Sequence, residues 1–206
     1  MSGASEAAIS RARDILLNNG GMLRTRDALA QGIHPRTLYA MRDAGVLERL
    51  ARGLYRLTEL EPMVHPDLSI VAARIPKSVV CLISALDYHG MTTQIPHDVD
   101  IALNRDEGPT TPRLEWPPVD VWWYGGEAYS AGIETHRIDG VDVKIYNAEK
   151  TLADCFKYRN KLWLEVVIEA LRMYRYEHKM NIPELIRYAR ICRVDNVMRP
   201  YVEALL

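Results

Sequence analysis

Residues 34–57, HPRTLYAMRDAGVLERLARGLYRL, have the pattern of a short helix, a glycine stop and a tight β-hairpin. Pro35 suits the first position of the helix, because its missing N–H would be unpaired there in any case. Gly45 is expected to end the helix after Ala44. The segments VLERL and LYRL flank ARG, a three-residue loop with glycine last, as a hairpin with a bulge prefers.

Two further helices are expected before this stretch. Apolar residues at helical spacing predict a helix over residues 5–18, which NNGG then ends. Thr25 is expected to cap a second helix, RDALAQ. The order helix, helix, turn, helix, hairpin predicts a winged helix-turn-helix domain over residues 1–57.

Charge is unevenly distributed along the chain. Residues 1–57 hold nine Lys and Arg against five Asp and Glu, a net charge of +4, whereas the remainder holds seventeen against twenty-two, a net charge of −5. The whole chain has a net charge of −1. A basic first quarter on an acidic remainder indicates an anionic partner for the first part alone.

The third helix offers its outer side to such a partner. Leu38 and Met41 share the inner side, while Arg36, Tyr39, Ala40 and Asp43 are expected on the opposite side, with Thr37 and Arg42 at the boundary. An arginine can bond a guanine edge through two parallel N–H groups, and an alanine can meet a thymine methyl. We therefore predict base contacts from Arg36 and Ala40, and a phosphate contact from Arg42.

The hairpin adds Arg49, Arg52 and Arg56, with Arg52 near its tip. A wing of this kind lies along the DNA backbone or in the minor groove, where negative potential attracts arginine. The predicted DNA-contacting residues are Arg36, Thr37, Tyr39, Ala40, Arg42, Arg49 and Arg52. The alternative is a protein-binding winged helix with a solvated arginine face, which the acidic Asp43 mildly favours.

Residues 58–67 are rich in proline and acid and are interpreted as a linker. Residues 68–90 are expected to be helical with a break near Pro76, and residues 98–105 and 119–125 to form strands. A hairpin is expected to turn at Asp139-Gly140, and from Asn147 onward the pattern is helical. The predicted fold class is α+β: the winged helix-turn-helix, then an α/β domain over 68–206 with a small mixed sheet and a helical C-terminal part.

Residues 20–57 closely resemble the N-terminal domain of the AbiEi family, antitoxins of bacterial type IV toxin–antitoxin systems. LISALDYHGMTTQIP (82–96) and NAEKTLADCFKYR (147–159) resemble later stretches of that family. The resemblance implies a winged helix that represses its own operon at inverted repeats of double-stranded DNA. It also implies a C-terminal domain that counters a nucleotidyltransferase-like toxin. The chain departs from the family pattern at His34, where serine is common, and at Ala40 and Asp43, where members are often more basic.

A basic cluster on or just after the helix that follows Asn147 is the predicted toxin-antagonising site, and it comprises Lys150, Lys157, Arg159 and Lys161. Glu149 is included, although a carboxylate in the first helical turn also complements the helix dipole. We expect a fragment of residues 68–206 to protect cells from the toxin and residues 1–57 to repress the promoter.

Enzyme chemistry has one weak candidate. Asp98, Asp100, Asp142 and Lys144 resemble the metal-binding pattern of a nuclease, whereas the alternative is outward residues on a half-buried hairpin. No zinc-binding or phosphate-cradling motif is present in the sequence. We therefore expect no enzyme activity, no cofactor and no metal. The aromatic stretch WPPVDVWWYGG (116–126) suggests core packing with one partly covered ring, or else a ligand platform.

The remaining features concern location and assembly. Cys81, Cys155 and Cys192 are far apart and are expected to be buried and reduced. No signal peptide or membrane-spanning run is evident, so a cytoplasmic protein without membrane contact is expected. The resemblance allows a monomer or weak dimer that binds paired repeats cooperatively. A ligand-sensing winged-helix regulator without a toxin partner is the alternative function.

Overall fold

A computed structural model describes residues 5–108, 110, 113–177 and 180–205. The chain divides into two compact units, which are described separately below. The first comprises Met1–Pro76 with Arg113–Pro117 and Arg137–Val143, and the second comprises Lys77–Pro112, Pro118–His136 and Lys144–Leu206.

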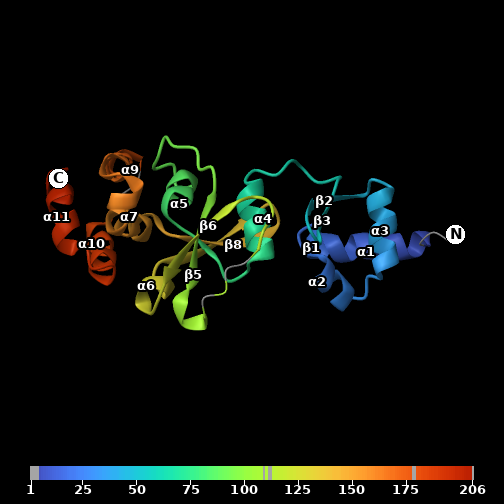
Figure 1. Cartoon of the computed structure of the whole chain (residues 1–206). Coiled ribbons are helices and arrows are strands. Elements are labelled where there is room, and N and C mark those ends of the chain that lie inside the picture. Colours follow the sequence, from blue (N-terminus) through green and yellow to red (C-terminus); the bar gives the residue numbers. More distant parts are fainter. Residues whose placement is uncertain (1–4, 109, 111–112, 178–179, 206) are drawn as a thin grey trace. The chain divides into compact units, whose positions relative to one another are not determined.

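The first unit contains the predicted winged helix-turn-helix (Figure 1). Its elements are α1 (Glu6–Asn18), β1 (Met22–Arg24), α2 (Thr25–Ala30), α3 (Pro35–Asp43), β2 (Leu47–Ala51) and β3 (Leu54–Leu57). The three strands form an antiparallel sheet in the order β1-β3-β2. Strand β1 was not expected from the sequence, because three residues are too few to show a strand periodicity.

Local side-chain chemistry sets the ends of these helices. Ser5 caps α1 by accepting a hydrogen bond from the backbone N–H of Ala8 at 3.3 Å. His34 caps α3, with Nδ1 accepting from the backbone N–H of Arg36 at 3.1 Å. The prediction that Thr25 caps α2 is wrong, because Thr25 is the first helical residue and Arg24 takes the cap position.

The wing hairpin is tighter than predicted. Ala51 pairs with Leu54, so the turn is Arg52-Gly53, and Gly53 adopts a left-handed conformation with φ +70°. The register shifts between Arg49 and Ala51, which confirms the expected bulge. This turn places Arg52 at the tip of the wing.

Two apolar clusters stabilise the first unit. The larger joins α1, α3 and the sheet, and its fully buried members include Leu16, Leu38, Met41 and Leu57. The smaller packs Met22 and Leu54 against Ile70 of α4 (Pro66–Arg74). The segment preceding α4 is anchored by the Asp139 carboxylate, which accepts hydrogen bonds from the backbone N–H groups of Val64 at 2.7 Å and His65 at 3.1 Å. Helix α4 is therefore packed against strands β1 and β3 of the three-stranded sheet.

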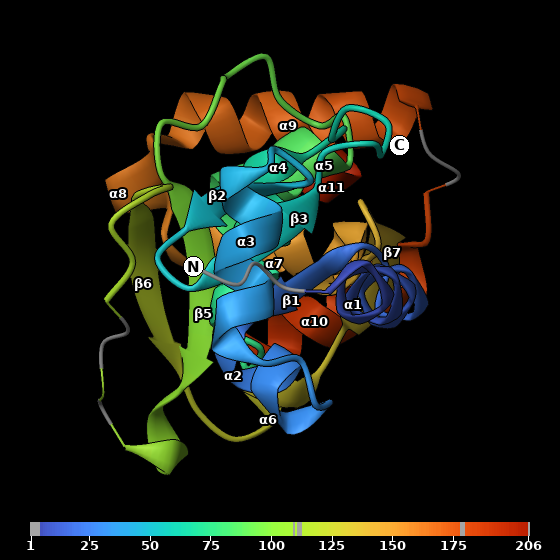
Figure 2. The same ribbon diagram turned by 90° about the vertical axis from the view of Figure 1, so that its right-hand side faces the viewer.

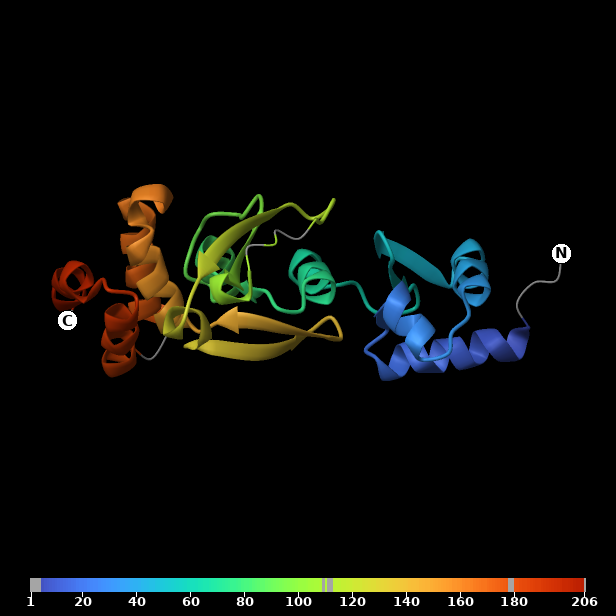
Figure 3. The same cartoon turned by 60° about the horizontal axis from the view of Figure 1, so that its bottom comes forward.

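A mixed five-stranded sheet has the order β6-β5-β4-β8-β7. The strands are β4 (Val79–Val80), β5 (Val99–Asn104), β6 (Val119–Tyr124), β7 (Ile133–Ile138) and β8 (Val141–Tyr146). Strands β5 and β6 are parallel and lie side by side (Figure 2). Strands β7 and β8 form the predicted hairpin (Figure 3), in which Asp139 and Gly140 both have positive φ. The two-residue central strand β4 replaces the middle of the helical segment expected over 68–90, and that expectation is wrong there.

Helices complete the second unit. The short ones are α5 (Leu82–Tyr88), the 3-10 turn η1 (Arg105–Glu107) and α6 (Glu127–Ser130). The predicted C-terminal helices are α7 (Ala148–Lys157), α8 (Arg159–Leu162), α9 (Leu164–Glu177), α10 (Ile182–Ile191) and α11 (Asp195–Glu203), and they gather together in Figure 1. Helix α7 lies at the centre of the core, with Leu152, Ala153, Cys155 and Phe156 fully buried. Within the described residues, none of the helices is both long and apolar enough to cross a membrane.

Candidate nucleic-acid interface

Helix α3 separates its residues as the pattern predicts. Leu38 and Met41 are buried in the core of the first unit. Arg36 is exposed, Ala40 is half-buried, and Tyr39 has 46% of its surface exposed, which is high for a large aromatic side chain. The outer side of α3 therefore presents a guanidinium, a methyl and an aromatic ring to solvent.

Arg42 is exposed but engaged. Its Nη2 lies 2.6 Å from Oδ1 of Asp43, and its guanidinium lies 5.2 Å from the centre of the Tyr39 ring. The neighbouring carboxylate offsets the charge that Arg42 would bring to a phosphate. Asp43 thus restrains the guanidinium of Arg42.

Two residues expected at this surface are buried instead. Thr37 is only 7% exposed, because the boundary of α3 faces the rest of its own unit. Arg56 is also 7% exposed, and its Nη1 donates to Glu48 at 3.0 Å. Arg56 serves the sheet rather than the outer face of the wing.

The wing carries the two exposed arginines that the sequence placed there. Arg49 donates from Nε to the carbonyl of Ala51 at 3.3 Å, so it lies against its own strand. Arg52 is exposed in the turn, and its carbonyl accepts a hydrogen bond from Nη1 of Arg74 at 2.7 Å. We call Arg36, Tyr39, Ala40, Arg42, Arg49 and Arg52 the α3–wing surface.

The basic cluster predicted on the second unit does not exist as a single exposed set. Lys150 is fully buried, and its Nζ lies 2.5 Å from Oδ2 of Asp154 one helical turn later. The ammonium also lies 4.1 Å from the centre of the Tyr146 ring. The expectation that Lys150 is exposed is wrong, because α7 is surrounded by core residues.

The partner carboxylate has a second contact. Cys192 donates from Sγ to Oδ1 of Asp154 at 3.1 Å. Burial raises the pKa of Asp154, and the ammonium of Lys150 opposes that rise. Both oxygens of Asp154 therefore have partners inside the core, as a buried carboxylate requires.

Glu149 has a structural contact. Tyr174 donates from its hydroxyl to Oε1 of Glu149 at 2.7 Å, and the same hydroxyl accepts from the backbone N–H of Asn181 at 2.8 Å. Glu149 therefore connects α7 to the end of α9 and the start of α10. This contact within the chain gives Glu149 a structural role that needs no partner protein.

Two of the other three basic residues lie beside an aromatic pair, Trp122 and Tyr158, whose ring centres are 4.6 Å apart. Lys161 lies 4.9 Å above the Trp122 ring, and Lys157 lies 5.5 Å from the centre of the Tyr158 ring. Arg159 is half-buried and donates to the carbonyl of Phe156 at 3.0 Å. We call Lys157, Arg159, Lys161, Trp122 and Tyr158 the basic–aromatic face.

The nuclease pattern is not assembled as a metal site. Asp100 is buried, where its carboxylate accepts from Nε1 of Trp122 at 2.9 Å and from the backbone N–H of Ser84 at 3.3 Å. Burial raises the pKa of Asp100 to about 6. Asp142 pairs with Arg137 at 2.8 Å, while Asp98 and Lys144 are exposed. Among the described residues, no three His, Cys, Asp or Glu side chains are grouped to hold a metal ion.

The aromatic stretch and the cysteines are mostly interior. Tyr124 is buried and stacks on Tyr146 with ring centres 5.9 Å apart, whereas Trp116 is 62% exposed. The cysteines are free and buried, as predicted: Cys81, Cys155 and Cys192. Burial raises the pKa of each thiol, which keeps it unreactive.

Comparison with known proteins bears on the first domain and on the fold of the whole chain. Residues 3–58 match the family model described as "Transcriptional regulator, AbiEi antitoxin", which confirms the resemblance seen in the sequence. A crystal structure of the RV2827C protein from Mycobacterium tuberculosis matches over 100% of this chain and 82% of its own, with a TM-score of 0.52 and 14% identity. At that identity the likeness concerns the fold alone. No functionally curated protein matches the sequence.

Proposed function

Because residues 3–58 match the AbiEi antitoxin transcriptional regulators, we propose that this chain is the antitoxin of a type IV toxin–antitoxin system. It represses its own operon by binding inverted repeats, and it counters a nucleotidyltransferase-like toxin. The observation that carries this proposal is the family match over the domain that holds the α3–wing surface. The protein acts in the cytoplasm as a monomer or weak dimer, and it contributes no catalytic group.

The α3–wing surface is the proposed DNA-binding site. Arg36 and Ala40 face outward on one side of α3, so that side can enter a major groove and meet base edges. Arg52 at the wing tip contacts the backbone or minor groove beside it. Thr37 is not included, because its side chain is buried.

The basic–aromatic face is the proposed toxin-antagonising site. Lys157 and Lys161 are exposed cations held beside rings, an arrangement suited to an acidic protein surface or to the phosphates of an RNA substrate. Glu149 and Lys150 are not included, since the first has a structural partner and the second is buried.

The two roles are best separated in the whole chain. A fragment beginning at residue 68 would lose Val64 and His65, which the carboxylate of Asp139 binds. Point variants avoid this loss. In cells that carry the toxin and a promoter reporter, we expect Arg36→Ala to lose repression and keep protection. We expect the double variant Lys157→Ala, Lys161→Ala to do the reverse.

Arg187→Ala serves as the control, because it removes an exposed arginine of α10 outside both surfaces. Protection by the wild-type chain, lost in the Lys157 and Lys161 double variant, supports the antitoxin assignment. A wild-type chain that represses the promoter but never protects cells contradicts the antitoxin role and leaves a plain transcriptional regulator.

A further inference from the structure

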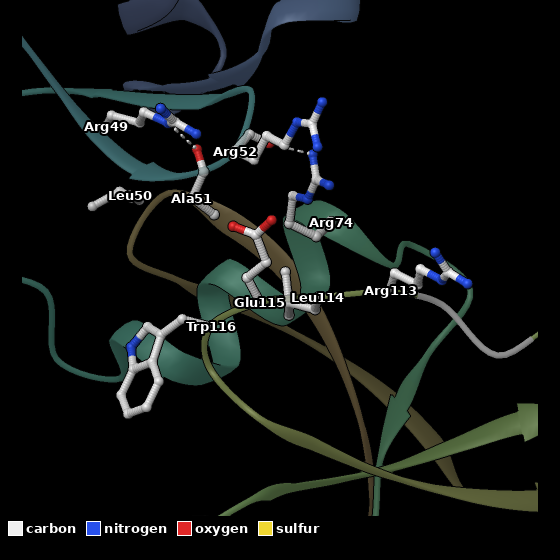
Figure 4. A pocket seen from close by; sticks show the side chains of 9 residues that line it. All are labelled: Arg49, Leu50, Ala51, Arg52, Arg74, Arg113, Leu114, Glu115 and Trp116. Carbon is white, nitrogen blue, oxygen red and sulfur yellow. Dashed lines mark hydrogen bonds between the residues drawn. The ribbon is translucent and has the colours of Figure 1, made fainter.

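A groove next to the wing gathers arginines from three separate segments of the first unit. The cavity has a volume of about 610 Å³, and the lining residues that matter here are Arg49, Arg52, Arg74, Arg113, Glu115 and Trp116 (Figure 4). Arg49 and Arg52 come from the wing, Arg74 from the end of α4, and Arg113 from the segment Arg113–Pro117. We call this cavity the wing groove.

A second cavity shares two of these arginines. It has a volume of about 380 Å³, and its arginines are Arg24, Arg26, Arg52 and Arg74. Arg52 and Arg74 line both cavities. The arginines of the two cavities therefore form one basic row past the tip of the wing. Asp27 offsets part of this charge, since it lies 2.6 Å from Arg24 and 3.3 Å from Arg26.

The described lining of the wing groove carries a net positive charge. Four arginines line it, while Glu115 is the one acidic residue among its described lining residues. Arg74 donates one N–H group to the carbonyl of Arg52, and its guanidinium has other N–H groups that can donate to a ligand. A group of arginines is suited to bind phosphate, because two phosphate oxygens can accept two parallel N–H bonds from one guanidinium.

The continuity of the row identifies the form of that phosphate. Arg49 and Arg52 already belong to the α3–wing surface, so any ligand in the groove is adjacent to DNA held by the wing. A row shared between two cavities fits successive phosphates of a backbone better than one small anion. We propose that the wing groove binds the backbone of the same duplex, with Arg74 and Arg113 contacting phosphates from outside the winged helix. This inference rests on the proposed DNA binding.

Arg74 has a second role in this arrangement. Its hydrogen bond to the carbonyl of Arg52 holds the turn that carries the wing-tip side chain. Helix α4 packs through Ile70 on Met22 and Leu54 of the sheet behind the wing. Arg74 is therefore a positioning residue for Arg52 as well as a phosphate contact.

The test measures promoter-duplex affinity of the full chain as a function of salt. Each phosphate contact contributes roughly 0.9 to the slope of log K against log salt, or a roughly threefold change in affinity between about 50 and 200 mM. We expect Arg113→Ala to reduce the slope by about that amount on promoter and shuffled DNA alike. Arg113→Lys should retain the slope, and so should Arg137→Ala, which removes an arginine of the same unit that pairs with Asp142.

Arg74→Lys should keep the charge but lose affinity by weakening the hold on the wing tip, and that loss should shrink when Arg52 is already alanine. An unchanged slope in Arg113→Ala overturns the inference, while promoter binding by the wild type would still uphold the proposed function. Inorganic pyrophosphate at matched ionic strength separates the two sources of phosphate. Pyrophosphate binding that needs Arg113, without any effect of Arg113 on DNA, overturns the inference in favour of a small-anion site.

Discussion

The α3–wing surface and helix α7 both carry basic residues, yet the fold exposes arginines of the first and buries Lys150 of the second. On α3 and the wing, Arg36 and Arg52 are exposed. On α7, Lys150 is fully buried and bound to Asp154. Helix α3 lies at the edge of a small domain with one covered side, whereas α7 is surrounded by α5, α9, α10 and the sheet.

This difference shows that a charge run indicates a partner only when its helix keeps a free side. A lysine inside a covered helix must find a counter-charge, because an unpaired buried ion is very costly. The spacing of Lys150 and Asp154, four residues apart, is the arrangement that brings such a pair together on one face. We therefore interpret Arg36 and Arg52 as serving a ligand and Lys150 as serving the core.

The largest expected effect comes from breaking the buried pair. Lys150→Ala leaves the carboxylate of Asp154 in the core without its counter-charge, so we expect the free energy of unfolding to fall by about 3–5 kcal/mol. Lys157→Ala should change it by less than about 0.5 kcal/mol, because that side chain is exposed. Chemical denaturation measures both values.

A double variant separates the ion pair from simple packing. Replacing both partners, as Lys150→Met with Asp154→Leu, removes both charges and should recover much of the loss. A double variant as unstable as Lys150→Ala would show that packing volume, rather than the uncompensated charge, explains the cost.

The second effect concerns the buried carboxylate of Asp100, whose pKa is raised to about 6 in the folded chain. An unfolded aspartate has a pKa near 3.9. Since the folded state binds the proton more tightly, the stabilising contribution is complete below about pH 4 and is lost as the pH rises to about 6. Relative to Asp100→Asn, the wild type should lose on the order of 2–3 kcal/mol of unfolding free energy across that range.

Denaturation followed by tryptophan fluorescence suits this measurement, because Trp122 donates to Asp100. A wild-type stability that changes with pH in parallel with that of Asp100→Asn would mean that the Asp100 carboxyl is not perturbed.

The sequence predicted local elements well where periodicity and turn chemistry agreed. The glycine stop at Gly45, the hairpin turn at Asp139-Gly140 and the helix that follows Asn147 all depend on neighbouring residues, and all are present. Strand β4 was missed, because two residues show no period and its place in the sheet depends on distant partners. Lys150 was misplaced for a related reason, since its burial depends on helices that pack on α7 from elsewhere in the chain.

The residues of the candidate DNA-binding site also fall into a group that local sequence predicts and a group that only the tertiary fold brings together. Arg36 and Arg52 were found from helix and hairpin geometry, which are local. Arg74 and Arg113 were not, because only the tertiary fold brings α4 and the segment beginning at Arg113 next to the wing.

The third effect tests the predicted base contact of Arg36 on the α3–wing surface. We expect Arg36→Ala to weaken promoter binding by about 1–3 kcal/mol and to relax preference at one base pair, since a bidentate arginine discriminates by that amount. Fluorescence anisotropy with single-base promoter variants measures it. Equal losses on promoter and random DNA would instead make Arg36 a phosphate contact.

The smallest effect concerns Asp43, whose carboxylate lies 2.6 Å from Arg42. Asp43→Asn should free Arg42 and tighten binding on all DNA sequences by less than about 1 kcal/mol, because surface pairs contribute little. The matched control is Asp14→Asn, an exposed acid on α1. A gain confined to one DNA sequence would show that Asp43 contacts a base rather than restraining Arg42.

The most direct measurement is the affinity of the full chain for its own promoter duplex and for a duplex of the same composition in shuffled order, at one salt concentration. A sequence-specific regulator binds its site about a thousandfold or more tighter than other DNA. We expect a preference of that order for the promoter, reduced in Arg36→Ala. Equal affinity for the two duplexes would contradict sequence recognition by the α3–wing surface.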